Sequence, residues 1–391
     1  MTKQIFKQYF AAFFLVLMSV QYILLEGYGT STIKIAAMAI APFILAGFSP
    51  KVSRAFRFGG LYLLIVTISL FINSESFRFT TVLYKFSFVI MFIMYYNLIY
   101  CEKAFTVNYF IKILRGLLYA YIICLILQQA AIIVGIRSLP VINLMNFLGR
   151  GLGANSLAME PSHSARIMSA SMLVLLRMHE VKWGKSNVTI LRLYKYDKWL
   201  IFGFLWAMVS MGSGTAFVGL AILSFYFIQR RFSFVVISVL VILYFTIPII
   251  DYEPLNRVKA SFEAVQTLDQ EVIIENDYSA AARIVPLINT FTELNLSEKE
   301  TWLGKGVDTA VSADYLSEEQ TIGGVSDYGL ISYIVSLLFV MVCCIKKLWS
   351  LETLFFILML GAGIGNIAYS WGILMLFTTS KYFSMNYKLN Q

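Results

Sequence analysis

Apolar segments of the length needed to cross a lipid bilayer recur along most of the chain and constrain its fold more than any other feature. Of 391 residues, 59% are hydrophobic and 14% are charged, whereas about a quarter of the residues of a soluble domain are charged. A span takes about 20 apolar residues as a helix, which satisfies its own backbone hydrogen bonds in lipid. The sequence therefore predicts an all-α polytopic membrane protein with about 11–12 transmembrane helices. The expected spans are roughly 9–26, 32–48, 58–73, 79–100, 113–135, 162–178, 198–211, 214–229, 233–250, 326–345 and 351–367, with a short twelfth at about 369–383.

The longest polar stretch, 251–325, divides these segments into two groups. It contains fourteen acidic and five basic residues, although the whole chain has a formal net charge of +9. Loops of this length are usually lids, binding loops or disordered segments. Helical patterning over Leu255–Leu268 and Ser279–Leu294 favours a folded cap. The expected organisation is nine helices with a loop at 136–160 (residues 1–250), a large loop (251–325) and C-terminal helices (326–391).

The basic residues predict the orientation of the chain. Nineteen of the 31 Lys and Arg residues lie at ends of expected spans that would face one side, and membrane proteins keep such residues on the cytoplasmic side. Both termini are therefore expected inside, and loops 136–160 and 251–325 outside. Because the bases form no single patch, no nucleic-acid partner is expected. The basic segment Arg177–Lys198 has two open interpretations, a contact with anionic lipid headgroups or a solvated connector.

Metal ligands and disulfides are not expected. The four cysteines fall in spans or at their inner ends, and the two histidines, His163 and His179, fall on opposite sides of the expected membrane. No spacing typical of a metal site occurs. Asp251 and Glu253 have the acid-x-acid form that can bind a divalent ion, but their position favours a membrane exit.

Polar residues gather where the loop 136–160 enters the next span. Glu160 precedes Pro161, which suits the first turn of a helix, and Ser162, His163 and Arg166 then lie on neighbouring parts of one helix face. An arginine one turn inside a membrane helix is unfavourable unless it faces a polar cavity or a partner. Two interpretations stay open, a structural pair of Glu160 with Arg166 or a functional site. Lys85 similarly either extends to the interface or contacts a phosphate.

Several motifs follow one another in a recognisable order. Gly149–Gly153 contains Arg150 and precedes the Glu160 motif, and Ser210–Ala216 is a turn rich in Ser, Gly and Thr. Asp277–Arg283 contains Ser-x-x-x-Arg, Leu303–Val307 contains Gly-x-Gly, and Asp327–Gly329 opens the next span. Over about residues 149–345 this set resembles the O-antigen polymerase (Wzy-type) family of bacterial inner-membrane glycosyltransferases, which are related to O-antigen ligases.

The resemblance implies a GT-C-like architecture with the active site facing the periplasm, and polymerisation of oligosaccharide repeats carried on undecaprenyl pyrophosphate, without metal or cofactor. Arginine suits such a leaving group because its planar fork meets phosphate oxygens in pairs. Further implied partners are membrane lipids and a chain-length regulator protein. The alternatives are an O-antigen ligase-type transferase and a flippase for the lipid-linked unit. The implied catalytic residues are Arg283, Glu160 (as base) and Arg166, and the implied substrate-binding residues are Arg150, Ser162, His163, Arg257, Gly304, Gly306, Asp327 and Tyr328.

Overall fold

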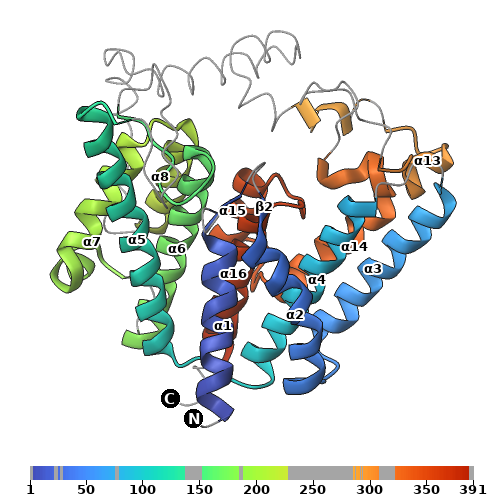
Figure 1. Cartoon of the computed structure of the whole chain (residues 1–391), viewed down its shortest axis with the longest axis horizontal. Helices are drawn as coiled ribbons and strands as arrows, with labels where there is room; N and C mark the ends of the chain where they lie inside the picture. Colours follow the sequence, from blue (N-terminus) through green and yellow to red (C-terminus); the bar gives the residue numbers. More distant parts are fainter. Residues whose placement is uncertain are drawn as a thin grey trace.

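The computed structural model is helical apart from one short β-ladder, which confirms the predicted all-α class for the residues it describes (Figure 1). These residues are 3–21, 25–26, 30–74, 79–136, 152–184, 188–227, 285–286, 288–290, 292, 294–307 and 322–386. The elements are α1 (Lys3–Ser19), β1 (Leu25–Glu26), β2 (Thr30–Ser31), α2 (Thr32–Phe48), α3 (Arg54–Ile72), α4 (Phe79–Tyr100), α5 (Val107–Ile133), α6 (Pro161–Trp183), α7 (Ile190–Ser210), α8 (Gly214–Phe227), α13 (Lys299–Leu303), the 3-10 turn η1 (Ile322–Gly324), α14 (Val325–Cys343), α15 (Leu351–Leu360) and α16 (Ala368–Asn386).

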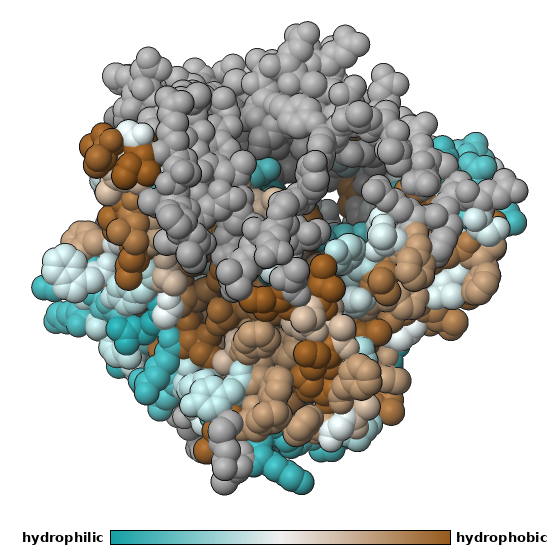
Figure 2. All heavy atoms as spheres, in the orientation of Figure 1, coloured by the Kyte–Doolittle hydropathy of each residue, from teal (hydrophilic) through white to brown (hydrophobic). Residues whose placement is uncertain are grey.

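The apolar helices indicate a membrane protein. Among the described residues, α3, α4, α5 and α14 are long and apolar enough to cross a bilayer, and α2, α8 and α15 are apolar but shorter. Large hydrophobic side chains are exposed on these helices, for example Phe71 at 80% and Ile133 at 72%. Hydrophobic residues also cover much of the surface seen in Figure 2. Water disfavours apolar surface on this scale, whereas lipid accepts it. The expected ninth span, 233–250, lies outside the described residues.

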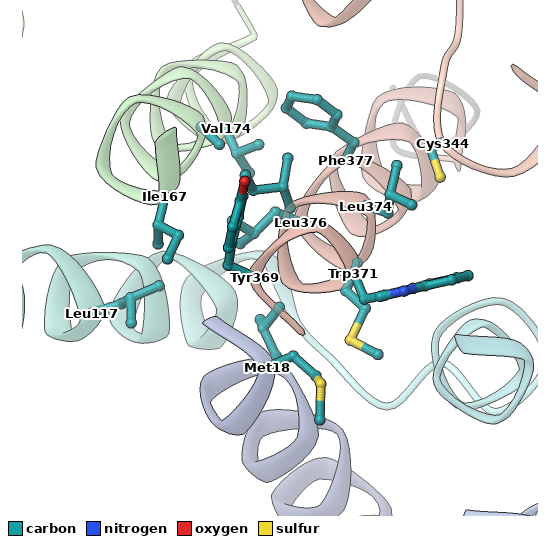
Figure 3. Close-up of a cluster of buried hydrophobic side chains, with 14 of the residues drawn as sticks. Met18, Leu117, Ile167, Val174, Cys344, Tyr369, Trp371, Leu374, Leu376 and Phe377 are labelled. Atoms are coloured by element: carbon teal, nitrogen blue, oxygen red, sulfur yellow. The ribbon is translucent and has the colours of Figure 1, made fainter. Parts of the chain in front are cut away.

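Helix α16 forms the centre of the bundle and packs against α1, α4 and α6. Every residue from Tyr369 to Ser380 is buried, and Figure 3 shows its side chains meeting those of the surrounding helices. The Trp371 ring stacks on Phe88 of α4 at 5.9 Å between centroids and also contacts Phe92. Burying side chains of this size removes a large apolar area and fixes α4 against α16.

Two groups of helices flank this centre (Figure 1). One group contains α5, α6, α7 and α8, with α15 packed on α8, and the other contains α2, α3, α4, α13 and α14. Small residues allow close approach within the bundle, as is common for membrane helices. A Cβ on Gly372 of α16 would lie 2.9–3.0 Å from atoms of Ser19 and Met18 in α1, so these two helices nearly touch through their backbones.

Some helix ends differ from the predicted span boundaries. Helix α1 ends at Ser19 rather than near residue 26. The Gln21 amide donates to the Leu157 carbonyl at 3.0 Å instead of to a carbonyl within the helix. Helix α15 ends at Leu360 rather than 367, because Gly361 adopts a left-handed conformation with φ of 62°. The predicted start at 198 fits a break in α7 at Asp197, whose carboxylate accepts from the Leu200 amide at 3.2 Å.

The helices place charged residues at two opposite ends of the bundle. The end we call the basic end joins the start of α1 to the α4–α5 turn through Lys7 and Glu102, and α6 to α15 through Arg177 and Glu352. The start of α1 and the end of α16 also lie at this end (Figure 1). We call the opposite end the site end. It contains the exit of α1, the start of α6, the start of α16 and the segment 304–307, which docks on α14.

Candidate functional site

The start of α6 has the geometry that the sequence predicts. Glu160 occupies the position before the first turn, with extended backbone, and Pro161 begins the helix. The Glu160 carboxylate does not cap the helix; its Oε2 accepts from the Ser162 hydroxyl at 3.1 Å and lies 3.8 Å from Nε2 of His163. Its side chain is 59% exposed. The carboxylate is therefore accessible at the site end while held next to an imidazole.

His163 connects this helix start to the exit of α1. Its Nδ1 lies 3.0 Å from Oε1 of Gln21, and the same oxygen accepts from the Met159 amide at 2.9 Å. An amide oxygen can only accept hydrogen bonds. With the Gln21 amide oriented so that Oε1 faces His163, Nδ1 must therefore be the donor and carry a proton. Nε2 on the other side of the ring faces Oε2 of Glu160. The His163 ring also packs on Tyr369 of α16, with centroids 4.4 Å apart.

Arg166 lies one turn further into α6 and does not pair with Glu160. Its Nη1 donates to the Tyr369 hydroxyl, and its guanidinium lies 5.5 Å from the centre of that ring. Its Nε is buried without a hydrogen-bond partner. Among the described residues no carboxylate lies within 4 Å of Arg166. The structural Glu160–Arg166 pair that the sequence left open is therefore not formed.

The Gly-x-Gly segment and the Asp327 motif, more than twenty residues apart in sequence, meet at the start of α14. The Lys305 amide donates to the Ser326 carbonyl at 2.7 Å, and the Gly306 amide donates to the Asp327 carbonyl at 3.2 Å. Asn73 at the end of α3 donates to the Gly304 carbonyl at 3.0 Å. Gly304 has φ of +82°, and a Cβ there would collide with the Asp327 backbone. The visible role of these glycines is to let two backbones pack directly.

A kink in α14 completes this contact. Gly329 has φ of +82° and ψ of 164°, which no helical residue adopts, and a Cβ on it would collide with the Trp302 carbonyl. The kink turns Tyr328 inwards, where it is buried and its hydroxyl has no hydrogen-bond partner. Asp327 stays partly exposed at the edge of the bundle. The backbone conformation at Gly329 therefore determines where Asp327 and Tyr328 lie.

Lys85 lies beneath this kink, and it is 4% exposed. Its Nζ is 3.8 Å from the centre of the Tyr328 ring and 5.9 Å from that of Tyr62. Asp327 acts on it electrostatically but is not within 4 Å, and no hydrogen bond links Lys85 to another described residue. Aromatic faces stabilise the ammonium, but no described residue accepts a hydrogen bond from it. The expectation that Lys85 extends to the interface is not supported.

Two packed rings relate the depth of Lys85 in the bundle to that of Tyr369, the partner of Arg166. Phe88 is one helical turn after Lys85, and Trp371 follows Tyr369 by two residues. Since these two rings stack on each other and Tyr95 bonds Thr379 further along, α4 and α16 run in the same direction. Lys85 and Tyr369 consequently lie at about the same depth from the site end.

Lys34 near the start of α2 is a third cation in this region. It is 9% exposed, and its Nζ lies 3.5 Å from the Gln21 carbonyl. Like Lys85 and Arg166, it has no carboxylate within 4 Å among the described residues. A charge withdrawn from water is costly unless it is paired or hydrogen-bonded. Lys34, Lys85 and Arg166 all lie towards the end of the bundle that exposes Glu160, and cations of this kind suit an anionic ligand.

Several predicted residues cannot be placed. Arg283, Arg150 and Arg257, together with Asp251 and Glu253, lie outside the described residues. In the part of the chain that is described, no group of three His, Cys, Asp or Glu residues is arranged to hold a metal ion. The structure adds Gln21, Lys34 and Tyr369 to the site. Lys34 carried a signal in the sequence, as an ionisable residue at the start of an apolar segment, whereas Tyr369 carried none.

A comparison of the chain with family models, curated proteins and solved structures found no match.

Proposed function

We propose that this protein transfers glycan chains from a polyprenyl pyrophosphate carrier to the hydroxyl of an incoming lipid-linked repeat, as a polysaccharide polymerase of the bacterial inner membrane. The observation that carries the proposal is a set of three cations without a carboxylate within 4 Å among the described residues, at the same end of the bundle as Glu160: the buried Lys34 and Lys85 and the partly buried Arg166. A pyrophosphate supplies the missing negative charges.

The reaction that fits these residues is a displacement at the anomeric carbon. The bond between that carbon and the pyrophosphate oxygen breaks, and a new bond forms to the acceptor hydroxyl. The hydroxyl proton passes to the Glu160 carboxylate, and polyprenyl pyrophosphate leaves with its charge balanced by Arg166 and, from the large loop, Arg283. Glu160 precedes Arg166 by six residues, about 9 Å along a helix at 1.5 Å per residue.

Purified full-length protein and one chemically defined lipid-linked oligosaccharide test this proposal. A polymerase yields a ladder of products that differ by one repeat, with one polyprenyl pyrophosphate released for each bond formed. A ligase-type transferase gives no ladder without its separate acceptor. Absence of any product from this substrate, with protein that is folded and inserted, would contradict the proposal.

Transport of the lipid-linked unit is a second candidate, favoured by one observation. Helix α15 has ten residues and is interrupted at Gly361 and Ala362, both with positive φ, before α16 begins. Transporters use such interrupted helices at their binding sites. Movement of a fluorescent lipid-linked unit across proteoliposomes, with no product ladder, would favour transport over polymerisation.

A further inference from the structure

Four exposed basic side chains lie where α6 ends and α7 begins. They are Lys182, Arg192, Lys195 and Lys198, and together we call them the α7 surface. None of them has a carboxylate within 4 Å among the described residues. Because they are exposed, water solvates their charges and the fold does not need a counter-ion there. Their charge is therefore available to an external anion.

The sequence from Lys182 to Trp199 contains a single acidic residue, Asp197, and this residue is turned into the bundle. It is 8% exposed. Arg115 of α5 binds its Oδ2 through Nε at 2.8 Å and through Nη2 at 2.5 Å, and Tyr119 donates to its Oδ1 at 2.6 Å. A neighbouring helix thus balances Asp197, so this carboxylate does not neutralise the α7 surface.

Aromatic rings hold two of the four bases in place. The Arg192 guanidinium lies 4.3 Å from the centre of the Trp183 ring, and Nζ of Lys182 lies 5.7 Å from the centre of the Tyr196 ring. Both rings pack on the buried His179 of α6, with centroids 4.4 and 4.9 Å from that of the imidazole. A guanidinium stacked on a ring keeps its N–H donors at the edge of its plane, where they can meet phosphate oxygens. These contacts fix the cations without neutralising them.

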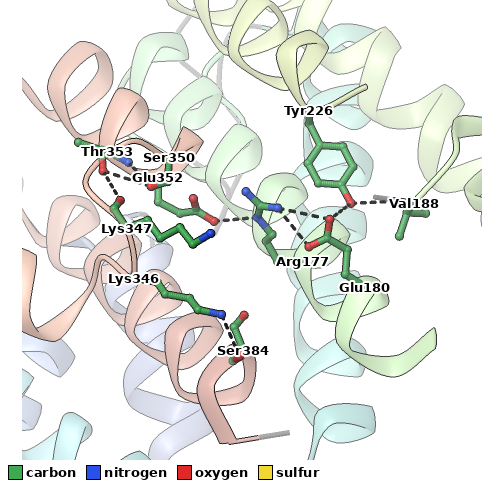
Figure 4. Close-up of polar contacts among 10 residues, drawn as sticks. All are labelled: Arg177, Glu180, Val188, Tyr226, Lys346, Lys347, Ser350, Glu352, Thr353 and Ser384. Atoms are coloured by element: carbon green, nitrogen blue, oxygen red, sulfur yellow. Dashed lines mark hydrogen bonds and ion pairs between the residues drawn. The ribbon is translucent and has the colours of Figure 1, made fainter. Parts of the chain in front are cut away.

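A chain of hydrogen bonds fixes the entry into α7 (Figure 4). The Val188 amide donates to the Tyr226 hydroxyl at 3.0 Å, and that hydroxyl donates to Glu180 of α6 at 2.9 Å. Arg177 binds the same carboxylate through Nη1 at 3.1 Å. The start of α7 is therefore attached to α6 and α8, and the nearby acid of α6, Glu180, is balanced by Arg177.

Beyond these bases, α7 continues into a flank that suits lipid. Phe202, Leu205 and Trp206 are exposed, and their spacing places them on one face of the helix. Trp199, between this apolar flank and the bases, is 70% exposed. Tryptophan at such a boundary is typical of the membrane–water interface. The α7 surface therefore lies at the depth of lipid headgroups, next to a flank that acyl chains can cover.

We propose that the α7 surface binds the phosphate groups of anionic phospholipids, whose acyl chains lie along the flank formed by Phe202, Leu205 and Trp206. Basic clusters beside an apolar membrane helix attract acidic headgroups. For the segment Arg177–Lys198, this selects the lipid contact over the solvated connector. A soluble polyanion such as RNA would match the charge but would make no use of the adjoining apolar flank. The proposal does not depend on glycosyl transfer.

Native mass spectrometry of the full-length protein in detergent, titrated with phosphatidylglycerol or phosphatidylcholine, tests the surface. We expect the first phosphatidylglycerol to bind more tightly than the first phosphatidylcholine. In the double variant Lys195→Gln with Lys198→Gln, the apparent Kd for phosphatidylglycerol should rise by about tenfold or more, because two bases near the headgroup are lost. Lys195→Arg with Lys198→Arg keeps both charges and should bind like the parent.

The matched control is Lys103→Gln with Lys112→Gln, which removes two exposed lysines from the α4–α5 turn and α5. This control changes the net charge equally but leaves the α7 surface intact, so its affinity for phosphatidylglycerol should stay close to that of the parent. Circular-dichroism melts of all variants verify that the fold is retained.

The outcomes separate the candidate ligands. Loss of phosphatidylglycerol affinity in the α7 variant but not in the control supports the proposal. Equal losses in both variants would show a general effect of net charge and overturn it, as would a parent protein that binds both lipids equally. Binding of a short RNA that depends on Lys195 and Lys198, without a preference for phosphatidylglycerol, would assign the surface to a soluble polyanion instead.

Discussion

The two ends of the helix bundle differ in whether their basic side chains are paired with carboxylates. At the basic end, Lys7 and Lys51 share Glu102, at 2.5 and 3.2 Å, and Arg177 lies between two glutamates. At the site end, Lys34, Lys85 and Arg166 lie among aromatic rings and carbonyls, without a carboxylate within 4 Å among the described residues.

Under the proposed function, the charges at the basic end stabilise the fold and the cations at the site end bind the pyrophosphate. In an ion pair, the attraction between the two charges offsets the free energy lost when the base leaves water. A buried base without a counter-ion has no such compensation and lowers the stability of the fold until an anion binds. Removing one member of a pair at the basic end should therefore weaken the fold. Removing a cation at the site end should weaken the activity and leave the unliganded fold intact.

The largest expected effect is that of Glu160→Gln. The amide keeps the shape of the side chain but cannot accept the hydroxyl proton, so transfer should slow by about a thousandfold. Glu300→Gln, an exposed residue of α13, is the matched control and should have normal activity. Polymer yield in the purified assay measures both variants. Normal polymer from Glu160→Gln would reduce Glu160 to a structural role.

Arg166→Lys tests whether the reaction needs the planar guanidinium of Arg166 or only its positive charge. Lysine keeps the charge but loses paired contacts to phosphate, so the rate should fall by about a hundredfold, with Arg166→Ala at least as slow. Arg57→Lys, an exposed base at the start of α3, controls for the substitution. Single-turnover rates with saturating donor report this loss. An unchanged rate would exclude Arg166 from the transition state.

Lys85→Met tests whether a cation at the site end contributes to substrate binding rather than to the stability of the fold. Methionine fills a similar volume without a buried charge, so the thermal unfolding temperature should stay the same or rise. The KM for the lipid-linked donor should increase by roughly tenfold, because a contact made in both ground and transition states is removed. A lower unfolding temperature with an unchanged KM would make Lys85 a structural residue, held by its contact with Tyr328.

Gly304→Ala tests the docking of the segment 304–307 on α14. A Cβ at this positive φ would collide with the Asp327 backbone, and the strain should cost about 1–3 kcal/mol. Gly60→Ala, in α3 with open space around it, is the control and should be neutral or slightly stabilising. Chemical denaturation in detergent compares the two variants. Equal stability would show that this backbone contact does not hold the segment.

The smallest effect concerns Glu102 at the basic end. Its hydrogen bond to Lys7, aided by Lys51, lowers the pKa of the carboxyl below its usual value. A lowered folded-state pKa means that the stabilisation is complete above the normal range for glutamate and disappears as the pH falls through the lowered value. Glu102→Gln should remove about 1 kcal/mol or less at neutral pH. The difference between variant and parent should shrink in acid; a constant difference would contradict the ionic explanation.

The sequence predicted the local features of the site better than its contacts. The start of α6 at Pro161, with Glu160 just outside it, follows from local rules that need no tertiary information. The end of α15 at Leu360 also had a local signal, since Gly361 is suited to a left-handed position after a helix. The predicted span 351–367 was too long because it followed the apolar composition and ignored the helix-ending signal of Gly361.

Long-range partners could not be predicted in this way. Arg166 bonds Tyr369, 203 residues further along the chain, and no spacing rule connects the two. The early end of α1 depends on the contact between Gln21 and Leu157, which exists only in the folded bundle. The meeting of the Gly304 segment with Asp327 likewise depends on two positive-φ glycines whose conformations the sequence does not specify.

Ligand-induced stabilisation of the purified protein tests the central claim, that the cations of the site end await a pyrophosphate. Undecaprenyl pyrophosphate should raise the unfolding temperature, because a ligand that binds only the folded state stabilises it. Undecaprenol, which has the same tail without phosphate, should have no comparable effect. The difference between the two lipids should be lost in Arg166→Ala combined with Lys85→Met. Equal stabilisation by both lipids, or the same pyrophosphate-dependent rise in the double variant, would contradict the account.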